Sequence, residues 1–391
     1  MTGTELAAHT GAVRALAARW LPCFGDGDFV CSPAGLWLAL GAVASGARGG
    51  TAEELRNVLG VDGEAAAGAV TAGGRWLRRT EGVAVATGVW SGVPVLDGFR
   101  QGLPDVGFGP LAGAGGAQRE IDSWVEESTG GRIDRLPLAL DGSEDLVLVN
   151  ALALKASWLG AFPAAGTRDK PFTDRNGDSA LVPTMHRRIP ATWAWRVGGA
   201  TVVELPCQGA GSAGPAGAAG GDEGRAGAEG SAVRVRFVLG AEGDDPAGAP
   251  AAAWAEAGRR EALRADGVEL ALPRFSLRAR TDVYGQLPAL GVSRAVRPGA
   301  DFSGLSPEEL CISKVVQEAL VEVAEQGVEA AAVTTVAMTR SGAPPRPKVI
   351  EEIAFDRPFG VVVLDASGEV PLFVGRQSSA PRSPARAGGS A

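Results

Sequence analysis

The sequence predicts an α+β fold, in which early helices are followed by later strands around a mostly antiparallel sheet. Three observations support this fold class. Apolar residues recur at helical spacing near the amino terminus, and short strand-like runs dominate after residue 181. In addition, 45% of the 391 residues are hydrophobic and 21% are charged, so the chain can bury a sizeable core.

Helices are expected early in the chain. The apolar spacing between Leu6 and Trp20 predicts a first amphipathic helix. The run LWLALGAVASGA predicts a second helix that ends at Gly46, and Thr51 with the two glutamates after it opens a third. Segment 119–133, which two glycines close, predicts another amphipathic helix.

Strands are expected both within and after these helices. VAVATGVWS (83–91) predicts a strand. DLVLVNALALKASW (145–158) predicts a central buried strand because it is long, apolar and bounded by charge. Short strands follow from residue 181, and one helix-like segment at 250–265 interrupts them.

Two segments differ from the rest in composition. Residues 208–232 contain 9 Gly and 8 Ala among 25 positions, which predicts an insertion in a surface loop. The tail 381–391 is similar and is expected to be disordered. Strand-like runs resume directly after the insertion, so we expect a single domain over residues 1–380.

Composition and motifs exclude several function classes. A net charge of −8 argues against nucleic acid or an anionic membrane as partner. Four scattered cysteines form neither a disulfide framework nor a metal spacing. His9 and His186, both expected at the surface, are the only histidines, and G-x-S-x-G and Walker motifs are absent, so no enzyme is predicted. GAGSAG (209–214) matches a dinucleotide fingerprint formally, but Pro215 follows where a helix should open, and no cofactor is expected.

No targeting segment is recognisable. No apolar run approaches the roughly 20 residues that a membrane span needs. The amino terminus lacks a basic cap followed by an apolar stretch, so we expect a cytoplasmic protein, with non-classical export left open. Arginine outnumbers lysine by 33 to 4, which suggests a GC-rich bacterial genome.

The segment 325–355 is not an ordinary loop. It joins two strand-like runs, and loops this long inside a compact domain are usually functional. The 12 residues 328–339 would span about 40 Å as a strand. Glu329 would face solvent, while the opposite face carries only small or apolar side chains, namely Val328, Ala330, Ala332, Thr334, Val336 and Met338. Residues 342–348 contain three prolines and cannot form a central strand, so a latent strand is joined to an exposed, cleavable tip.

These residues resemble those of a known family, the serpins, over roughly residues 5–380. EQGVEAAAV (325–333) is similar to the hinge that opens the serpin reactive loop. Further motifs resemble serpin segments and follow in the family's order: SPAGLWLALGAVASGARGGTAEEL, IDSWVEESTGGRI, LVNALALKASW, TRDKPF, VPTM, VELPCQG, LALPRFSL, ADFSGLS, DRPFGVVVLD and PLFVGR. With its arginine-rich composition, the chain is identified as a bacterial, actinobacterial member of this family.

The resemblance implies the serpin fold, with three β-sheets including a large five-stranded central sheet A, about nine helices and an exposed reactive-centre loop, here within 325–354. It also implies a suicide-substrate inhibitor of serine proteases, with no metal or cofactor. A protease attacks the loop and forms an acyl-enzyme, and the freed loop then inserts into the central sheet of a metastable protein. A non-inhibitory serpin, acting as a binding or interaction protein, is the alternative. Its hinge would typically carry charge or proline, whereas the inward face of this hinge carries neither before Arg340.

The resemblance also assigns residues to two regions. The hinge comprises Glu325, Gly327, Val328, Glu329, Ala330, Ala331 and Ala332. The sheet-opening region comprises Ser32, Pro33, Asn150, Trp158 and Gln317. Gly35 stands where the family usually has Ser, and Gln317 where many members have His, so a hydrogen bond of many members is expected to be absent or rebuilt. Val328 replaces the usual Thr or Ser, and an uncharged, β-branched residue should still insert.

The reactive bond is expected at Arg340–Ser341, with Thr339 and Gly342 as flanking candidates. Counting from Gly327 by the family's commonest loop length places the bond after Ser341, and one residue less places it after Arg340. Arg340 is favoured because a trypsin-like pocket with a buried acid gains a charge-assisted pair from arginine. The expected partner is a trypsin-like serine protease, and the inhibitor is expected to be a monomer.

Overall fold

The described part of the chain forms three β-sheets. The computed structural model describes residues 7–111, 113–136, 140–208, 233–241, 246–327 and 348–384. The sheet that concerns function has five strands, which are, in spatial order, β12 (Phe275–Asp282), β13 (Ile312–Val323), β4 (Leu146–Leu154), β2 (Val83–Ser91) and β3 (Gly107–Pro110).

This five-stranded sheet is mixed. β12 pairs antiparallel with β13 and β4 pairs antiparallel with β2, whereas β13–β4 and β2–β3 are parallel. Antiparallel pairing prevails over the three sheets together, but the expectation of a mostly antiparallel sheet does not hold for this one. β2 has the predicted bounds, and β4 is the central buried strand expected from its apolar sequence, with all nine residues buried.

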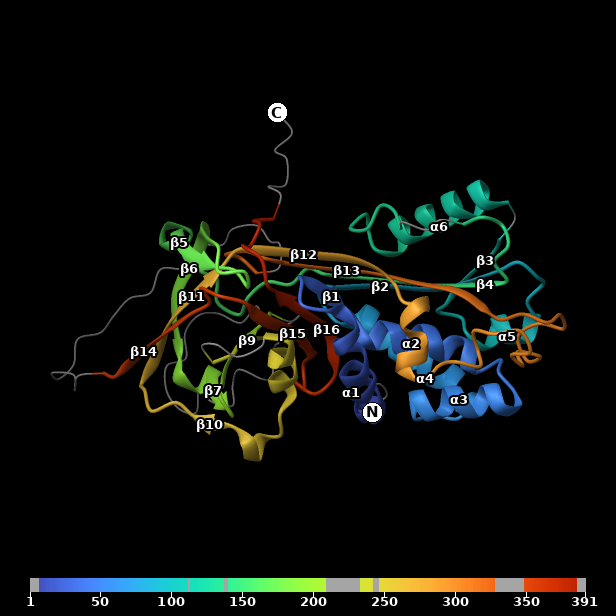
Figure 1. Cartoon of the computed structure of the whole chain (residues 1–391), viewed down its shortest axis with the longest axis horizontal. Coiled ribbons are helices and arrows are strands. Elements are labelled where there is room, and N and C mark those ends of the chain that lie inside the picture. The colour runs from blue at the N-terminus through green and yellow to red at the C-terminus, as the bar shows by residue number, and fades with distance from the viewer. Residues whose placement is uncertain are drawn as a thin grey trace.

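The other two sheets lie toward one end of the molecule (Figure 1). Four strands form the sheet β14 (Ile350–Ala354), β11 (Gly267–Pro273), β6 (Ser179–Pro190) and β5 (Arg168–Thr173). Seven strands, all antiparallel, form the sheet β1 (Phe29–Cys31), β16 (Pro371–Gln377), β15 (Phe359–Asp365), β9 (Val233–Leu239), β8 (Ala200–Pro206), β7 (Ala194–Val197) and β10 (Glu261–Ala262).

The described ranges contain seven α-helices, fewer than the resemblance implies. The four helices expected from the sequence are among them, and the full set is α1 (Thr10–Trp20), α2 (Pro33–Ala44), α3 (Gly49–Leu59), α4 (Gly63–Arg79), α5 (Asp97–Gly102), α6 (Ala114–Ser128) and α8 (Leu287–Leu290).

The helix expected at 250–265 was a wrong prediction. Two 3-10 segments, Pro246–Trp254 and Ala257–Arg259, and the short strand β10 stand there instead. Pro250 lies inside the first segment and disfavours an α-helix. The Ala253 carbonyl also does not serve a regular α-helix, because it accepts a hydrogen bond from Arg236 Nη1 at 2.6 Å.

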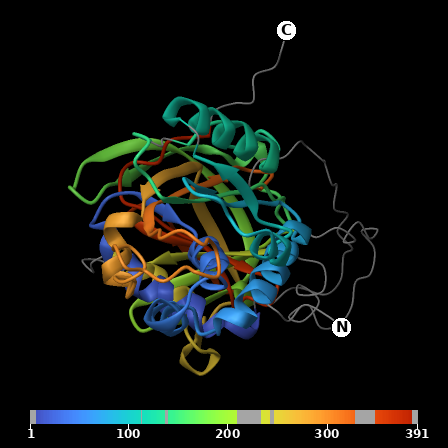
Figure 2. The same ribbon diagram turned by 90° about the vertical axis from the view of Figure 1, so that its right-hand side faces the viewer.

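Helices cover both faces of the five-stranded sheet. α6 lies along one face, and α1 to α5 gather on the other side (Figure 1), an order of layers that Figure 2 shows from the end. β4 alternates between two cores: Leu148 and Leu152 belong to the main core with α2, whereas Val149 and Ala151 belong to a separate small core with α6. Both faces of this sheet are therefore apolar, which explains why β4 reads as a continuous hydrophobic run.

The insertion and the tail are only partly described. Residues 209–232 and 385–391 lie outside the described residues. The beginning of the expected tail does not fit disorder: Pro381 is buried, and the Arg382 carbonyl accepts a hydrogen bond from Ser276 N of β12 at 3.0 Å. A backbone hydrogen bond to β12 therefore holds the chain at residue 382.

Candidate functional site

The parallel pairing of β13 with β4, which we call the seam, lies in the middle of the five-stranded sheet. Gln317 on β13 stands opposite Asn150 on β4, and both side chains are buried, each about 1% exposed. Parallel pairs are slightly less stable per residue than antiparallel ones. The seam is therefore one of the two pairings in this sheet, with β2–β3, that are weaker per residue.

A polar network crosses the seam beneath α2. The Gln317 side-chain amide donates to the Asn150 Oδ1 and to the Ser32 carbonyl, each at 2.9 Å, and its oxygen accepts from Ser32 N at 2.6 Å. Asn150 in turn donates to the Thr87 hydroxyl at 3.1 Å and to the Ala86 carbonyl at 3.3 Å. We call Ser32, Thr87, Asn150 and Gln317 the central network. It joins α2, β13, β4 and β2, and it satisfies polar groups whose burial would otherwise be costly.

Gly35 makes room for this network. A Cβ atom at position 35 would lie 2.1 Å from the Asn150 Oδ1 and 2.4 Å from the Leu152 Cδ1. The Asn150 oxygen thus occupies the space that a side chain at position 35 would take. A hydrogen bond was expected to be absent or rebuilt in this region, and the structure has one: the Gln317 amide donates to Asn150 directly across the seam. Gly35 lies beside this bond and leaves space for Asn150.

Ser32 fixes the end of α2 over the network. Its hydroxyl accepts from Gly35 N at 3.0 Å, which caps the helix, and donates to the Leu372 carbonyl of β16 at 2.6 Å. Pro33 follows in the first turn, where its missing N–H costs no hydrogen bond. α2 is therefore held in place both by its cap and by Gln317.

The expected hinge begins directly after β13. Glu325 is 7% exposed, and its carboxylate accepts from Arg274 Nε at 2.8 Å and from the Thr167 hydroxyl at 2.5 Å; Arg274 Nη2 is also in contact. Burial alone would raise the pKa of Glu325, but the hydrogen bonds from Arg274 and Thr167 outweigh it and hold the pKa below its usual value. Glu325 is therefore ionised and anchored at neutral pH.

Trp158 and Gly327 complete this end of the seam. The Trp158 ring is 1% exposed and donates from Nε1 to the Ala324 carbonyl at 3.0 Å, and its backbone N–H donates to the Gln326 carbonyl at 3.1 Å. Gly327 has φ +139°, and a Cβ there would lie 2.2 Å from the Ala156 oxygen. Only glycine fits this conformation and this close approach.

The sequence-predicted residues thus fall into two places. Ser32, Pro33, Asn150 and Gln317 lie at the central network, whereas Trp158 lies with Glu325 and Gly327 at the end of the seam. The remaining predicted hinge and reactive-bond residues lie outside the described residues: Val328, Glu329, Ala330, Ala331, Ala332, Thr339, Arg340, Ser341 and Gly342.

Three functional contacts were not foreseen. Arg274 and Thr167 hold Glu325, and Thr87 extends the network into β2. Arg274 lies in the LALPRFSL motif and Thr167 opens TRDKPF, so both motifs pointed to the region without assigning the contact.

Other candidate groups give no catalytic arrangement. His9 is half-buried and stacks on Trp37 with ring centroids 4.9 Å apart, so it is not simply a surface residue. Cys31 is buried, and Cys23 is partly buried. Among the described residues no cluster of histidine, cysteine and acidic side chains suits a metal ion. None of the helices in that part of the chain has the length and apolar character needed to cross a membrane.

Comparison with known families agrees with this geometry. The sequence profile of the family described as Serpin (serine protease inhibitor) matches residues 13–214 and 249–380. The chain belongs to the serpin family. The matched ranges include β4, β13, the central network and the hinge.

Serpins from distant organisms are 30–32% identical to this chain over the aligned residues. An uncharacterised serpin-like protein of Thermococcus kodakarensis is 32% identical over 66% of this chain and 56% of its own length. The leukocyte elastase inhibitor of Sus scrofa is 31% identical over 67% and 66%, and Serpin-Z1A of Triticum aestivum is 30% identical over 88% of each chain. The match thus spans little more than half of the archaeal relative. The bacterial origin expected from composition stays a prediction.

Solved serpin structures share the fold. Human thyroxine-binding globulin, complexed with its hormone, superposes with a TM-score of 0.78 at 22% identity, covering 97% of this chain and 100% of its own. The thermophilic serpin tengpin in its native state also gives 0.78, at 21% identity, covering 97% and 96%. At such identities the likeness concerns fold alone.

Proposed function

We propose that this serpin is a suicide-substrate inhibitor of a trypsin-like serine protease. The protease serine attacks the carbonyl carbon of Arg340, an ester bond forms, and the Arg340–Ser341 peptide bond breaks with the proton passing to the Ser341 amine. Residues 328–339 then enter the seam as a new strand between β13 and β4. The bound protease is carried along and distorted before water can hydrolyse the ester.

The observation that supports this proposal is the pairing at Gly327. Gly327 forms antiparallel bridges both to Ser157, which follows β4, and to Ala324, which follows β13. Continued for seven residues, the first pairing would bring Thr334 opposite Asn150 and the second would bring Thr334 opposite Gln317. Asn150 and Gln317 are already partners across the seam. Both edges therefore give one register for the inserting strand.

The lengths and faces also fit. The 12 residues 328–339 equal the 12 residues of β13 in number. In this register Met338 reaches Leu146, the first residue of β4, and Ala332 and Val336 fall in the rows of Leu152 and Leu148, which belong to the main core. The even-numbered, uncharged side chains would thus enter the apolar core.

Insertion is favourable in this geometry. A strand that enters the seam runs antiparallel to both neighbours, so one parallel pairing is replaced by two antiparallel ones. Each net hydrogen bond contributes about 0.5–1.5 kcal/mol, and full burial of a Val or Met side chain about 1.5–3 kcal/mol. Ordering the strand costs roughly 1–2 kcal/mol of entropy per residue. The gains offset this cost only if separating β13 from β4 takes little additional free energy.

Incubation with trypsin tests the proposal. We expect a covalent complex that survives denaturing electrophoresis, and mass spectrometry should find a released carboxy-terminal peptide that begins at Ser341. Arg340→Ala should abolish the complex with trypsin, whereas Thr339→Ala should leave most of it. A peptide that begins at Gly342 or Thr339 would reject the bond assigned here.

Paired thermal melts separate inhibition from the alternative. The loop-cleaved protein should melt well above the intact protein, although a chain cut usually destabilises. Equal or lower stability after cleavage would remove the inhibitory mechanism and favour a non-inhibitory serpin that acts as a binding protein.

A further inference from the structure

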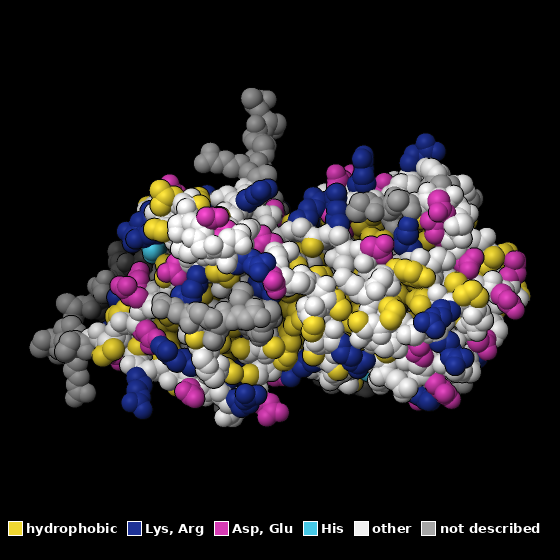
Figure 3. Space-filling view, in the orientation of Figure 1, with side chains coloured by type: hydrophobic (Ala, Val, Ile, Leu, Met, Phe, Trp, Pro, Cys, Tyr) yellow, Lys and Arg dark blue, Asp and Glu magenta, His cyan; other side chains and the backbone are white. Residues whose placement is uncertain are grey.

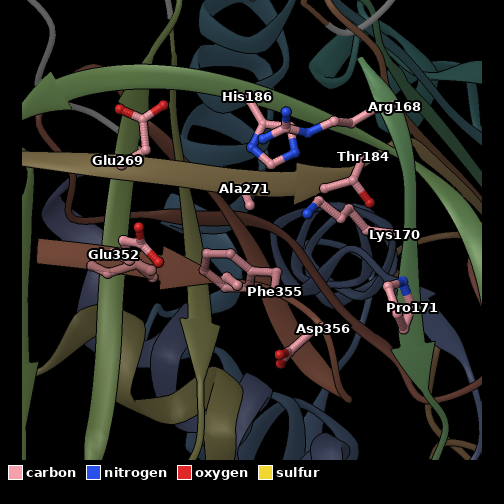
Figure 4. A pocket seen from close by; sticks show the side chains of 12 residues that line it. Arg168, Lys170, Pro171, Thr184, His186, Glu269, Ala271, Glu352, Phe355 and Asp356 are labelled. Atoms are coloured by element: carbon pink, nitrogen blue, oxygen red, sulfur yellow. The ribbon is translucent and has the colours of Figure 1, made fainter. Parts of the chain in front are cut away.

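A cavity of about 380 Å³ lies on the outer face of the four-stranded sheet. All four strands contribute to its wall (Figure 4), and Phe355 and Asp356, directly after β14, complete it. Cavities of this size commonly hold small molecules. Basic and acidic side chains lie close together on the surface at this end of the molecule (Figure 3).

The strand register sorts the charges of this cavity into rows. Arg168 on β5 pairs with Thr184 on β6, one row from the cavity's centre, and Lys170 lies one row further out. The central row consists of His186, Ala271 and Ala354. The next row, on the other side, consists of Arg188, Glu269 and Glu352, and of these only the two glutamates line the cavity. Successive rows on one face are about 7 Å apart, because two residues separate them. The cations Arg168 and Lys170 therefore line one end of the cavity, and the carboxylates of Glu269 and Glu352 line the other. Ala271 and Ala354 lie between them beside His186. The lining also includes Asp356, whose carboxylate is paired with Arg357 at 3.2 Å.

The charged groups at the two ends lack strong partners. Arg168, Lys170 and Glu352 are exposed and form no ion pair within the part of the chain that the structure describes. Glu269 meets only Arg188, at 3.7 Å. In a protein with a net charge of −8, two unpaired cations side by side are not a consequence of overall composition.

His186 also lines the cavity and adds a polar group to it. Its Nε2 is buried and has no hydrogen-bond partner among the described residues. Burial, followed by the charges of Arg168 and Lys170, lowers the pKa of His186, so the imidazole is neutral at pH 7. A neutral imidazole can donate one hydrogen bond to an anion that the two cations attract. Figure 4 shows the side chains of His186, Arg168 and Lys170 close to one another.

We propose that this cavity binds a small zwitterion, an amino acid whose carboxylate and ammonium groups are joined by a short aliphatic chain. The carboxylate lies toward Arg168, Lys170 and His186. The ammonium group lies toward Glu269 and Glu352, and the methylene groups cover Ala271 and Ala354. Such a ligand contacts all four strands at once, so its binding stabilises the native protein.

Calorimetry with three probes of equal chain length tests this charge pattern on the full-length protein. The first probe, ε-aminocaproate, carries one positive and one negative charge. Adipate carries two negative charges, and hexamethylenediamine carries two positive charges. We expect ε-aminocaproate to bind about tenfold more tightly than either symmetrical probe, because only it makes a charge-assisted contact at both ends. It should also raise the melting temperature, whereas the other two should raise it less.

Charge-removing variants assign the two ends. Lys170→Gln and Glu352→Gln should each weaken ε-aminocaproate about tenfold, and both sites are exposed, so folding is preserved. Arg264→Gln and Glu308→Gln remove the same charges at exposed positions outside the cavity and should change nothing. Adipate binding as tightly as ε-aminocaproate, with no effect of Glu352→Gln, would overturn the zwitterion assignment. No binding of any probe would overturn the site itself. Neither result depends on protease inhibition.

Discussion

Gly35→Ala is the sharpest single test of how the seam is held closed. The added Cβ would lie 2.1 Å from the Asn150 Oδ1 and 2.4 Å from the Leu152 Cδ1, and both partners are buried. Ordinary contacts begin near 3.4 Å, so the Asn150 amide must move by more than 1 Å. That movement takes it away from Gln317, Thr87 and the Ala86 carbonyl at the same time.

The magnitude follows from two opposing contributions. Overpacking a filled core costs about 1–3 kcal/mol, and each weakened hydrogen bond of Asn150 about 0.5–1.5 kcal/mol. Removing glycine from a helix returns about 0.5–1 kcal/mol. With all three hydrogen bonds of Asn150 weakened, the net destabilisation is about 1.5–7 kcal/mol, which lowers the melting temperature of a chain of this length by about 2–9 °C.

Thermal melts of intact protein, with Gly68→Ala as the matched control, measure this effect. Gly68 lies in α4 with nothing within 4 Å of its added Cβ, so that variant should be slightly more stable than the parent. Asn150→Ala in the Gly35→Ala background should cost less than the two single changes together, because the clash disappears with the amide. A Gly35→Ala protein at least as stable as the parent would show that Asn150 does not occupy this space.

Three further predictions concern the hinge and the insertion. Glu325 has a lowered pKa, so its contribution to stability is present above pH ~4.3 and is lost as pH falls through the folded pKa. Between pH 7 and pH 3 the melting temperature should therefore fall less steeply for Glu325→Gln than for the parent protein. Ala330→Glu would bury an unpaired carboxylate, so we expect cleavage without covalent complex on gels, whereas Glu329→Ala should keep the complex. Deletion of the insertion, residues 208–232, should leave the difference in melting temperature between intact and cleaved protein unchanged. Loss of that difference would mean that the insertion contributes to the core.

The elements that were predicted correctly are those whose structure depends mainly on their own sequence. β2 and β4 were recognisable because an apolar run bounded by charge or glycine has few other solutions. The segment 250–265 failed because alanine-rich composition favours a helix, while Pro250 and the bond from Arg236 to the Ala253 carbonyl decide against it. That bond depends on a strand that comes earlier in the chain, so no local pattern reveals it.

The central network shows the same limit at the site. Resemblance singled out Gly35, Asn150 and Gln317, and it marked two of them as unusual. It did not show that the departures at Gly35 and Gln317 compensate for each other, because these residues are 282 positions apart in the sequence and are linked only through Asn150 in the folded sheet. Physical fit, with one side chain filling the space left by another, is a property of packing.

Thr334 tests whether the inserted strand takes the register given by Gly327. In that register its hydroxyl would enter between Gln317 and Asn150, whose direct bond must break when the seam opens. Thr334→Val would leave these buried amides short of a partner in the cleaved protein alone, a cost of about 1–3 kcal/mol. The cleaved form should then melt lower by about 1–4 °C, and the intact form should not change, because the closed network is complete without Thr334. Thr335→Val, on the opposite face, is the control. An equal change in both variants would mean that the strand enters in another register, although it still enters.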